Sequence, residues 1–240
     1  MSTQGYRPVT GAPGGWRARV GVLLPAANSV LEPELYQMAP RGVTFHFARM
    51  GRSTKEINVA GLSEYGAQIE PLSELLAAAK VDLFLFGCTV GSMVHGLGFD
   101  QDIVGRIQKK TGVAAITTAM AVVEAMRQLG MKKLSVITPY VDEINEKEEE
   151  FLHGCGFEVL NLRGLGLLTG GIENVSPFEV YRFGKETLKA EADGLFISCA
   201  NLRALEIVEA LERDVGKPVV AAVPASLWLV LRRLGIRDPI

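Results

Sequence analysis

Two cysteines follow two apolar segments of similar composition. Cys88 ends the segment LFLFGC and precedes TVGS, and Cys199 ends the segment LFISC and precedes ANLR. We expect each thiol at the end of a buried strand and directly before a helix, where backbone N–H groups and the positive end of the helix dipole lower a thiol's pKa. Two opposed thiols can act as base and acid on either face of a carbon, or as nucleophile and proton donor across a double bond.

The alternative interpretation of each cysteine is structural, because free cysteine is among the most buried residue types. The equivalent placement of Cys88 and Cys199 in the two halves of the chain favours the catalytic interpretation. The third cysteine, Cys155, has no counterpart in the other half, and we interpret it as structural. Together with His153 it supplies one His-x-Cys pair, which is short of the ligands that a zinc site requires, so we expect no metal.

Further polar groups follow the predicted strand ends and complete a candidate site for an anionic ligand. Asn28 follows the first strand, and its amide can donate to a carboxylate or cap the next helix. Tyr140 occupies the equivalent place in the second half, where it offers a phenolic donor or packs as a half-buried aromatic. We expect the residues directly after the two cysteines to present backbone N–H groups to oxyanions. These residues are Thr89, Val90, Ala200 and Asn201.

Two other side chains are weaker candidates. His95 lies seven residues after Cys88 and would activate that thiol only if the intervening chain turned back toward it. Arg203 is expected either to pair with a carboxylate or to lie on a solvated helix face.

The elements that must position these residues alternate along the chain from Arg19 onward. Eight apolar, β-rich segments are predicted as strands, at 19–25, 43–50, 81–88, 113–119, 133–140, 157–165, 194–200 and 218–224. Segments with helical spacing lie between them, at 63–80, 100–111, 118–129, 142–153, 176–192, 201–215 and 225–234. Continuous apolar runs are typical of parallel strands covered by helices on both faces, so the pattern indicates a doubly wound α/β fold. We interpret the acidic run EKEEE at 146–150 as a solvated helix face.

The two halves of the chain repeat one another. The strand ending at Pro25 corresponds to the one ending at Pro139, at an offset of 114 residues, and the two cysteine strands correspond at an offset of 111. We therefore predict two pseudo-symmetric four-stranded parallel-sheet domains, flavodoxin-like or Rossmann-like, with the site in the cleft between them. The first domain is expected to comprise 19–118 plus 225–240, and the second 119–224. Residues 1–18 are predicted to be a flexible arm.

The composition excludes several classes of protein. The chain has 240 residues and a formal net charge of −2, which argues against nucleic acid as a partner. No apolar run approaches the roughly 20 residues that span a bilayer, and the N-terminus lacks the apolar core of a signal peptide. We therefore expect no membrane association and a cytoplasmic location, which suits three reduced thiols. The dinucleotide, nucleotide-phosphate, serine-hydrolase and zinc-protease motifs are all missing from the sequence.

Several of these segments together resemble a known family. VGVLLPAANSVLEPE, FGCTVGS, ITPYVDEINE, LLTGGIENV and ISCANLRALE are similar to the aspartate/glutamate racemase superfamily, in the branch of maleate cis-trans isomerase and arylmalonate decarboxylase. The resemblance covers the chain from about residue 19 to 234. It implies an enzyme without a cofactor, a homo-oligomer, and a small carboxylate or dicarboxylate substrate held between two α/β domains.

The resemblance also assigns roles residue by residue. Maleate isomerases of this branch carry residues that match Cys88, Cys199, Asn28 and Tyr140, and a further asparagine for which Asn174 is the nearest match. Arylmalonate decarboxylases have glycine in place of the residue matching Cys88 and keep only the second cysteine. The departure at Cys88 argues against simple decarboxylation.

The leading expectation from this resemblance is cis-trans isomerisation of a small unsaturated dicarboxylate, of the maleate-to-fumarate type. The Cys88 thiolate would add to an alkene carbon, the enediolate-like intermediate would rotate, and Cys199 would serve as acid and then base. The alternatives are a racemase or an arylmalonate-type decarboxylase that works through an enolate with the same cysteines, and a non-catalytic dicarboxylate-binding protein. We expect the glycine-rich segment Gly164 to Gly171 to be a mobile loop at the site.

Overall fold

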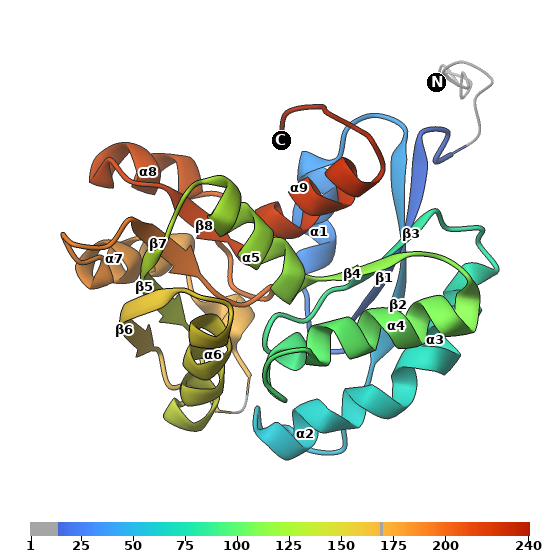
Figure 1. Cartoon of the computed structure of the whole chain (residues 1–240), viewed down its shortest axis with the longest axis horizontal. Helices are drawn as coiled ribbons and strands as arrows, with labels where there is room; N and C mark the ends of the chain where they lie inside the picture. Colours follow the sequence, from blue (N-terminus) through green and yellow to red (C-terminus); the bar gives the residue numbers. More distant parts are fainter. Residues whose placement is uncertain (1–13, 169) are drawn as a thin grey trace, which may run out of the picture.

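The computed structural model describes residues 14–168 and 170–240, so most of the predicted N-terminal arm lies outside the described residues. These residues form two lobes side by side (Figure 1). The first sheet contains β1 (Ala18–Pro25), β2 (Val43–Met50), β3 (Leu83–Phe86) and β4 (Ala115–Thr117) in the order β2-β1-β3-β4. The second contains β5 (Lys133–Thr138), β6 (Glu158–Gly164), β7 (Gly194–Ile197) and β8 (Val219–Ala221) in the order β6-β5-β7-β8. All pairs are parallel, and the repeated order confirms the predicted pair of four-stranded parallel sheets.

Helices cover both faces of each sheet. In the first lobe they are α1 (Leu31–Met38), α2 (Val59–Ser63), α3 (Ile69–Ala77) and α4 (Phe99–Thr111). In the second they are α6 (Asp142–Gly154), α7 (Pro177–Thr187) and α8 (Val208–Val215). The inner strands β3 and β7 are buried at every position, as the continuous apolar runs predicted. Local signals define helix starts: Ser176 and Glu179 form a capping box ahead of α7, with Pro177 in its first position.

The remaining helices, α5 (Thr118–Gln128) and α9 (Ala222–Arg233), lie where the two lobes meet (Figure 1). They pack against each other, while α5 also contacts β4 and β8, and α9 contacts α1 and β8. Near the start of the described chain, Arg17 forms two hydrogen bonds of 2.7 Å with Asp238 and so ties β1 to the C-terminal segment. The division into 19–118 plus 225–240 and 119–224 stays a prediction.

Three predicted helices differ from the structure. The one predicted at 176–192 ends at Thr187 as α7. The segment predicted as one helix at 63–80 consists of the end of α2, a 3-10 turn at Glu64–Gln68, and α3. The segment predicted at 201–215 is helical only from Val208, because backbone groups before it are hydrogen-bonded elsewhere: the Leu205 N–H donates to Glu34 Oε1 at 3.4 Å.

The acidic run in α6 was interpreted as solvated, and this is wrong at one residue. Glu148 is 0% exposed, because the 3.6-residue period places it in line with the buried Ile144, Phe151 and Leu152. Glu146 and Glu150 on the other face are exposed. Among the residues that the structure describes, no helix is both long and apolar enough to cross a membrane.

Candidate active site

A cavity of about 250 Å³ lies between the carboxyl ends of the two sheets. Loops that follow β1, β3, β5 and β7 line it, as expected of a ligand site in parallel α/β sheets. The predicted site residues found in its lining are Asn28, Cys88, Thr89, Val90, Tyr140, Cys199, Ala200 and Asn201. Its size suits a small metabolite, since pockets for drug-sized ligands begin at about 300 Å³. The structure thus brings the two cysteines into one cavity.

Cys88 lies two residues beyond β3 and is 6% exposed. The turn that follows it is a three-residue 3-10 helix at Val90–Ser92, so the predicted α-helix directly behind the thiol is wrong. The N–H of Gly91 bonds to the thiol and lowers its pKa. A Cβ at Gly91 would lie 2.7 Å from Cys88 Sγ, so glycine lets the backbone approach the sulfur.

Cys199 lies two residues beyond β7 and is 8% exposed. Its φ of 93° is in the left-handed region, which is rare for a residue other than glycine and marks local strain. In this conformation the N–H of Asn201 donates to Cys199 Sγ at 3.4 Å, and the Tyr140 hydroxyl also bonds to the sulfur and lowers its pKa. As with Cys88, no α-helix begins directly behind the thiol.

The sequence predicted that both thiols would have lowered pKa values, and the structure shows the opposite in the free protein. Burial raises the pKa of Cys88 to about 12 and that of Cys199 to about 11, and it outweighs the hydrogen bonds that stabilise each thiolate. Both thiols are therefore protonated at neutral pH. Chemistry that needs a thiolate must generate it when substrate occupies the cavity.

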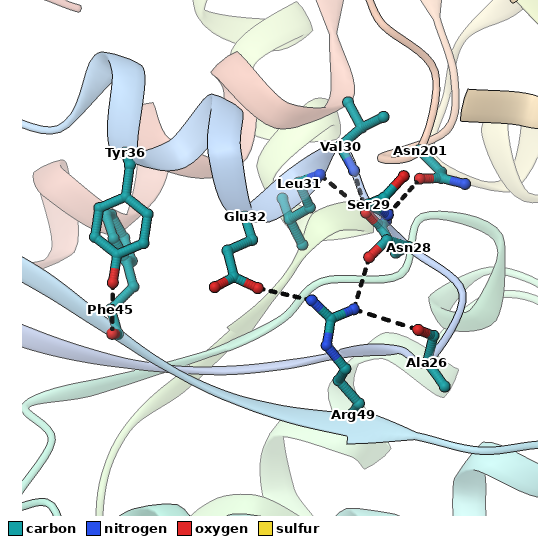
Figure 2. Close-up of polar contacts among 10 residues, drawn as sticks. All are labelled: Ala26, Asn28, Ser29, Val30, Leu31, Glu32, Tyr36, Phe45, Arg49 and Asn201. Atoms are coloured by element: carbon teal, nitrogen blue, oxygen red, sulfur yellow. Dashed lines mark hydrogen bonds and ion pairs between the residues drawn. The ribbon is translucent and has the colours of Figure 1, made fainter. Parts of the chain in front are cut away.

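Asn28 has the capping role that was its alternative interpretation, and it also joins the two lobes. Its Oδ1 accepts from the N–H groups of Val30 and Leu31 at 3.0 and 2.9 Å, at the start of α1 (Figure 2). Its Nδ2 donates to Ala200 O at 3.0 Å. An amide nitrogen carries two donors, so one N–H is left for a ligand.

Arg49 holds the loop that carries Asn28. Its guanidinium donates to the carbonyl of Asn28 at 2.7 Å and to that of Ala26 at 3.3 Å, and it pairs with Glu32 at 2.7 Å (Figure 2). The loop after β1 is therefore fixed from the neighbouring strand β2, which carries Arg49.

The loops after β3 and β7 are also joined. The Ala200 N–H donates to Thr89 Oγ1 at 3.1 Å, and the Ser29 N–H donates to Asn201 Oδ1 at 3.0 Å. The N–H groups of Ala200 and Asn201 are thus occupied within the protein, contrary to the prediction that they would be offered to a substrate oxyanion. The corresponding groups of Thr89 and Val90 have no partner among the described residues.

Three titratable residues of the cavity lining were not singled out from the sequence: Arg52, Tyr65 and Glu173. Arg52 follows the end of β2, and its charge lowers the pKa of Cys88. It donates to Lys55 O at 3.0 Å and has no carboxylate within ion-pair distance in the described part of the chain. The signal that could have identified Arg52 is its position just after β2, which belongs to the same sheet as the strand that carries Cys88. Glu173 accepts from Asn201 Nδ2 at 3.2 Å.

Other candidates lie outside the cavity lining. Asn174 and Arg203 line a neighbouring depression, where Arg203 pairs with Glu206 at 2.8 Å. His95 lies 3.0 Å from Ser63 Oγ and packs edge-on against Phe99, so it does not activate Cys88 in this structure. Cys155 is half-buried, and no cluster of three possible metal ligands occurs within residues 14–168 and 170–240.

Comparison with known proteins identifies the family of this two-cysteine fold. The family model described as arylmalonate decarboxylase matches residues 20–239. A maleate isomerase of Pseudomonas putida is 28% identical over 92% of this chain and 93% of its own.

Solved structures give the same result. A maleate isomerase variant from Pseudomonas putida S16 with maleate superposes with a TM-score of 0.86 at 25% identity, over 91% of this chain and 92% of that chain. A maleate cis-trans isomerase of Nocardia farcinica, a cysteine-to-serine variant with a covalently bound succinylcysteine intermediate, gives a TM-score of 0.85 at 26% identity, over 91% and 93%. Because the family model spans nearly every described residue, including both cysteine loops, the chain belongs to the arylmalonate decarboxylase family of enzymes.

Proposed function

We propose that the protein is a cis-trans isomerase of a small unsaturated dicarboxylate, of the maleate-to-fumarate type, and that it works without a cofactor. The observation that carries this proposal is the pair Cys88 and Cys199, which line one cavity from corresponding loops of the two lobes. The similarity to proteins named maleate isomerase supports it.

The reaction follows from the chemistry of the two thiols. Cys88 gives up its proton to solvent water as the substrate binds, and its sulfur forms a C–S bond with one alkene carbon while the π electrons move onto the other carbon and its carboxylate. Cys199 donates its proton to that carbon, and the former double bond is now single and rotates. Cys199 then removes a proton from the same carbon, the double bond forms again in the trans geometry, and the C–S bond breaks to release the Cys88 thiolate. The succinylcysteine in the Nocardia farcinica variant is a saturated adduct of the kind that this sequence of steps requires.

Named groups can hold the two carboxylates. The second N–H of Asn28 and the N–H groups of Thr89 and Val90 are uncharged donors that face no partner in the described part of the chain. The Tyr140 hydroxyl is a further donor once it exchanges its bond to Cys199 Sγ for one to the substrate. Such donors, aimed at developing negative charge, contribute about 3 to 4 kcal/mol each when well placed. Arg52 adds a positive charge beside Cys88, which favours both the thiolate and a dianionic substrate. We assign no contact with substrate to Asn174, which lies outside the cavity lining.

Decarboxylation of an arylmalonate is the second candidate, because the matching family model carries that description. It needs only Cys199 to deliver a proton to the carbanion left by loss of carbon dioxide. A second cysteine in the cavity is superfluous for this reaction, so Cys88 favours the isomerase. Racemisation through an enolate would use both cysteines as bases.

The test is proton NMR of the purified protein with maleate in D2O. We expect the fumarate vinyl signal to appear with the wild type, and to be lost with Cys88→Ser and with Cys199→Ser. Cys155→Ser is the matched control, since Cys155 lies outside the cavity lining, and it should keep full activity. Absence of fumarate together with carbon dioxide release from phenylmalonate would establish the decarboxylase instead. Binding of maleate without any turnover would leave the non-catalytic binding protein.

A further inference from the structure

Glu148 of α6 is a fully buried carboxyl that the proposed reaction does not use. It is 0% exposed, and neither of its carboxylate oxygens makes a hydrogen bond of standard length and angle. Ser198, which directly precedes Cys199, is also 0% exposed, and its hydroxyl likewise makes no hydrogen bond of standard length and angle. It lies near enough to Glu148 for a weak hydrogen bond, which lowers the pKa of the carboxyl by less than burial raises it. These three atoms are three of the four unpartnered buried side-chain polar atoms in the described part of the chain.

A structural role does not explain this carboxyl. Burying an unpaired carboxyl is costly, whereas an apolar side chain at the same position of the helix would pack without that penalty. Native proteins pair nearly all buried polar groups, and the exceptions gather at functional sites. Glu148 is therefore better explained by its neighbours at the cavity than by the stability of α6.

Residues on the inner face of α6 lie beside the carboxyl ends of β5 and β7 in the second lobe. Asn145 accepts from the Thr138 hydroxyl at 2.5 Å and donates to the Tyr140 carbonyl at 3.3 Å, so it fixes the loop after β5. One helical turn further, Glu148 lies beside Ser198 at the end of β7. Its negative charge raises the pKa of both Cys199 and Tyr140.

We propose that Glu148 is a positioning residue, which acts beside Ser198 to hold Cys199 in its protonated form and so makes Cys199 the proton donor and Cys88 the nucleophile. The inference rests on the isomerase function proposed above, because that reaction needs one thiolate and one thiol at the same time. Above about pH 7, where Glu148 is ionised, its carboxylate behind Cys199 opposes a second negative charge there. The carboxylate thereby assigns the two chemically identical side chains to different roles.

The charges around the two thiols differ in sign. Arg52 acts on Cys88 and favours its thiolate, whereas Glu148 acts on Cys199 and opposes its thiolate. The other titratable groups that face this cluster are Tyr140, whose pKa is raised by burial and by charge on Cys199 and on Glu148, and Cys88 itself. The pKa values of the free thiols, about 12 and about 11, both reflect burial first and do not select the nucleophile. The nucleophile is selected instead by the charges nearby, positive at Arg52 beside Cys88 and negative at Glu148 beside Cys199.

The first test measures how fast the Cys199 thiol is alkylated when it is the only cysteine in the chain. In a Cys88→Ser, Cys155→Ser background Cys199 is the one remaining thiol, and its rate of alkylation by iodoacetamide reports the thiolate fraction. Adding Glu148→Gln should raise that rate at pH 8 several-fold, up to about tenfold, because loss of the negative charge lowers the pKa of the Cys199 thiol. Glu146→Gln, on the exposed face of the same helix, should leave the rate unchanged. An unchanged rate with a folded Glu148→Gln protein would overturn the inference.

A second measurement needs no substitution of Glu148. Burial raises the pKa of Glu148 to about 7, so in the same two-serine background the logarithm of the alkylation rate should rise with pH, flatten near pH 7 as the carboxyl ionises, and rise again. A straight line of unit slope from pH 6 to 9 contradicts the inference, even if Glu148→Gln fails to fold.

Activity separates this inference from the function on which it rests. With all three cysteines present, Glu148→Gln should lower kcat for maleate and shift the pH profile, with KM unchanged, because Glu148 does not line the cavity. The alkylation experiments contain no substrate. Failure to isomerise maleate would therefore remove the proposed function and leave the thiol result intact, whereas isomerisation with no effect of Glu148 on Cys199 would remove only the inference.

Discussion

The side-chain amide of Asn28 donates to the backbone carbonyl of Ala200 at 3.0 Å and thereby joins the loop after β1 to the loop after β7. These loops belong to different lobes, and Ala200 directly follows Cys199. The same amide accepts from two N–H groups at the start of α1. One side chain thus orders a helix start, the junction of the lobes and a cysteine loop.

Two substitutions of Asn28 separate these roles. Asn28→Asp keeps the acceptor oxygen for α1 but loses the donor to Ala200, so we expect a folded protein whose kcat/KM for maleate falls at least tenfold, because a carboxylate also repels the substrate. Asn28→Ala loses both roles and should lower the free energy of unfolding by about 1 to 2 kcal/mol as well. Urea unfolding and steady-state kinetics measure the two effects. Equal kinetics for Asn28→Asp and wild type would contradict the assignment.

Gly91 is predicted to be required for the position of the Cys88 sulfur. A Cβ there would lie 2.7 Å from Sγ, so Gly91→Ala must displace the thiol or the turn that carries it. We expect a loss of isomerase activity of at least tenfold and slower alkylation of Cys88. Gly105→Ala in α4 is the matched control, since a Cβ there meets no atom within 4 Å, and it should retain activity. Full activity of Gly91→Ala would show that the close approach has no role.

Arg52 is predicted to act on both the substrate and Cys88. Arg52→Gln removes the positive charge beside the thiol, so we expect a higher KM for maleate and a lower kcat, with Arg52→Lys partly restoring both. Lys55→Gln, an exposed cation three residues away, is the control and should behave as wild type. If Arg52→Gln and Lys55→Gln have the same small effect on kcat and KM, Arg52 acts only through long-range electrostatics and has no specific role in the cavity.

The stability of the protein is expected to fall as the pH rises from about 5 to 8. Burial raises the pKa of Glu148 to about 7, so the folded state holds a proton on this group in a range where the unfolded chain has lost it. The free energy of unfolding therefore decreases through that range, by about 3 kcal/mol for this group. Glu34, whose pKa burial also raises to about 7, adds to the same trend.

Urea unfolding at pH 5, 6, 7 and 8 checks this slope. Glu148→Gln should remove part of the decrease, because a glutamine does not ionise. Glu146→Gln is again the control and should keep the wild-type slope. A wild-type stability that is constant or rising over this range would show that Glu148 is not held in the protonated form by burial.

The sequence predicts the strands and the location of the cavity correctly, but it predicts the protonation of the two cysteines in that cavity wrongly. Continuous apolar runs and the repeat between the halves are local signals, and they place Cys88 and Cys199 at corresponding strand ends, as observed. The pKa values were predicted in the wrong direction because burial depends on packing from the whole fold, and because both turns after the cysteines lack an α-helix.

Two functional candidates, Glu148 and Arg52, were not identified from the sequence because their surroundings also depend on tertiary packing. Glu148 sits within a run of charged residues, and only its position on the inner face of α6 shows that it is buried. Arg52 lies in a loop whose sequence resembles ordinary solvated chain, and its place in the cavity depends on the path of the loop after β2. Spacing offered a weak signal for both residues: Arg52 closely follows a strand, and Glu148 is in helical register with apolar residues. Neither signal alone distinguishes a cavity residue or a buried one from a solvated charge.

The order of the chemical steps predicts what accumulates when Cys199 is replaced. In Cys199→Ala the Cys88 sulfur can still bond to the alkene, and water can slowly protonate the resulting carbanion. No thiol is then present to remove a proton from that carbon, so the saturated adduct neither reverts nor proceeds to product. We expect a covalent adduct on Cys88, detected by intact-protein mass spectrometry as a gain of one maleate per chain, together with loss of fumarate formation. Cys88→Ala should gain no such mass, and Cys155→Ala should turn over without accumulating it. An adduct found on Cys199 instead, in the Cys88→Ala protein, would reverse the roles of the two cysteines and with them the argument from Arg52 and Glu148.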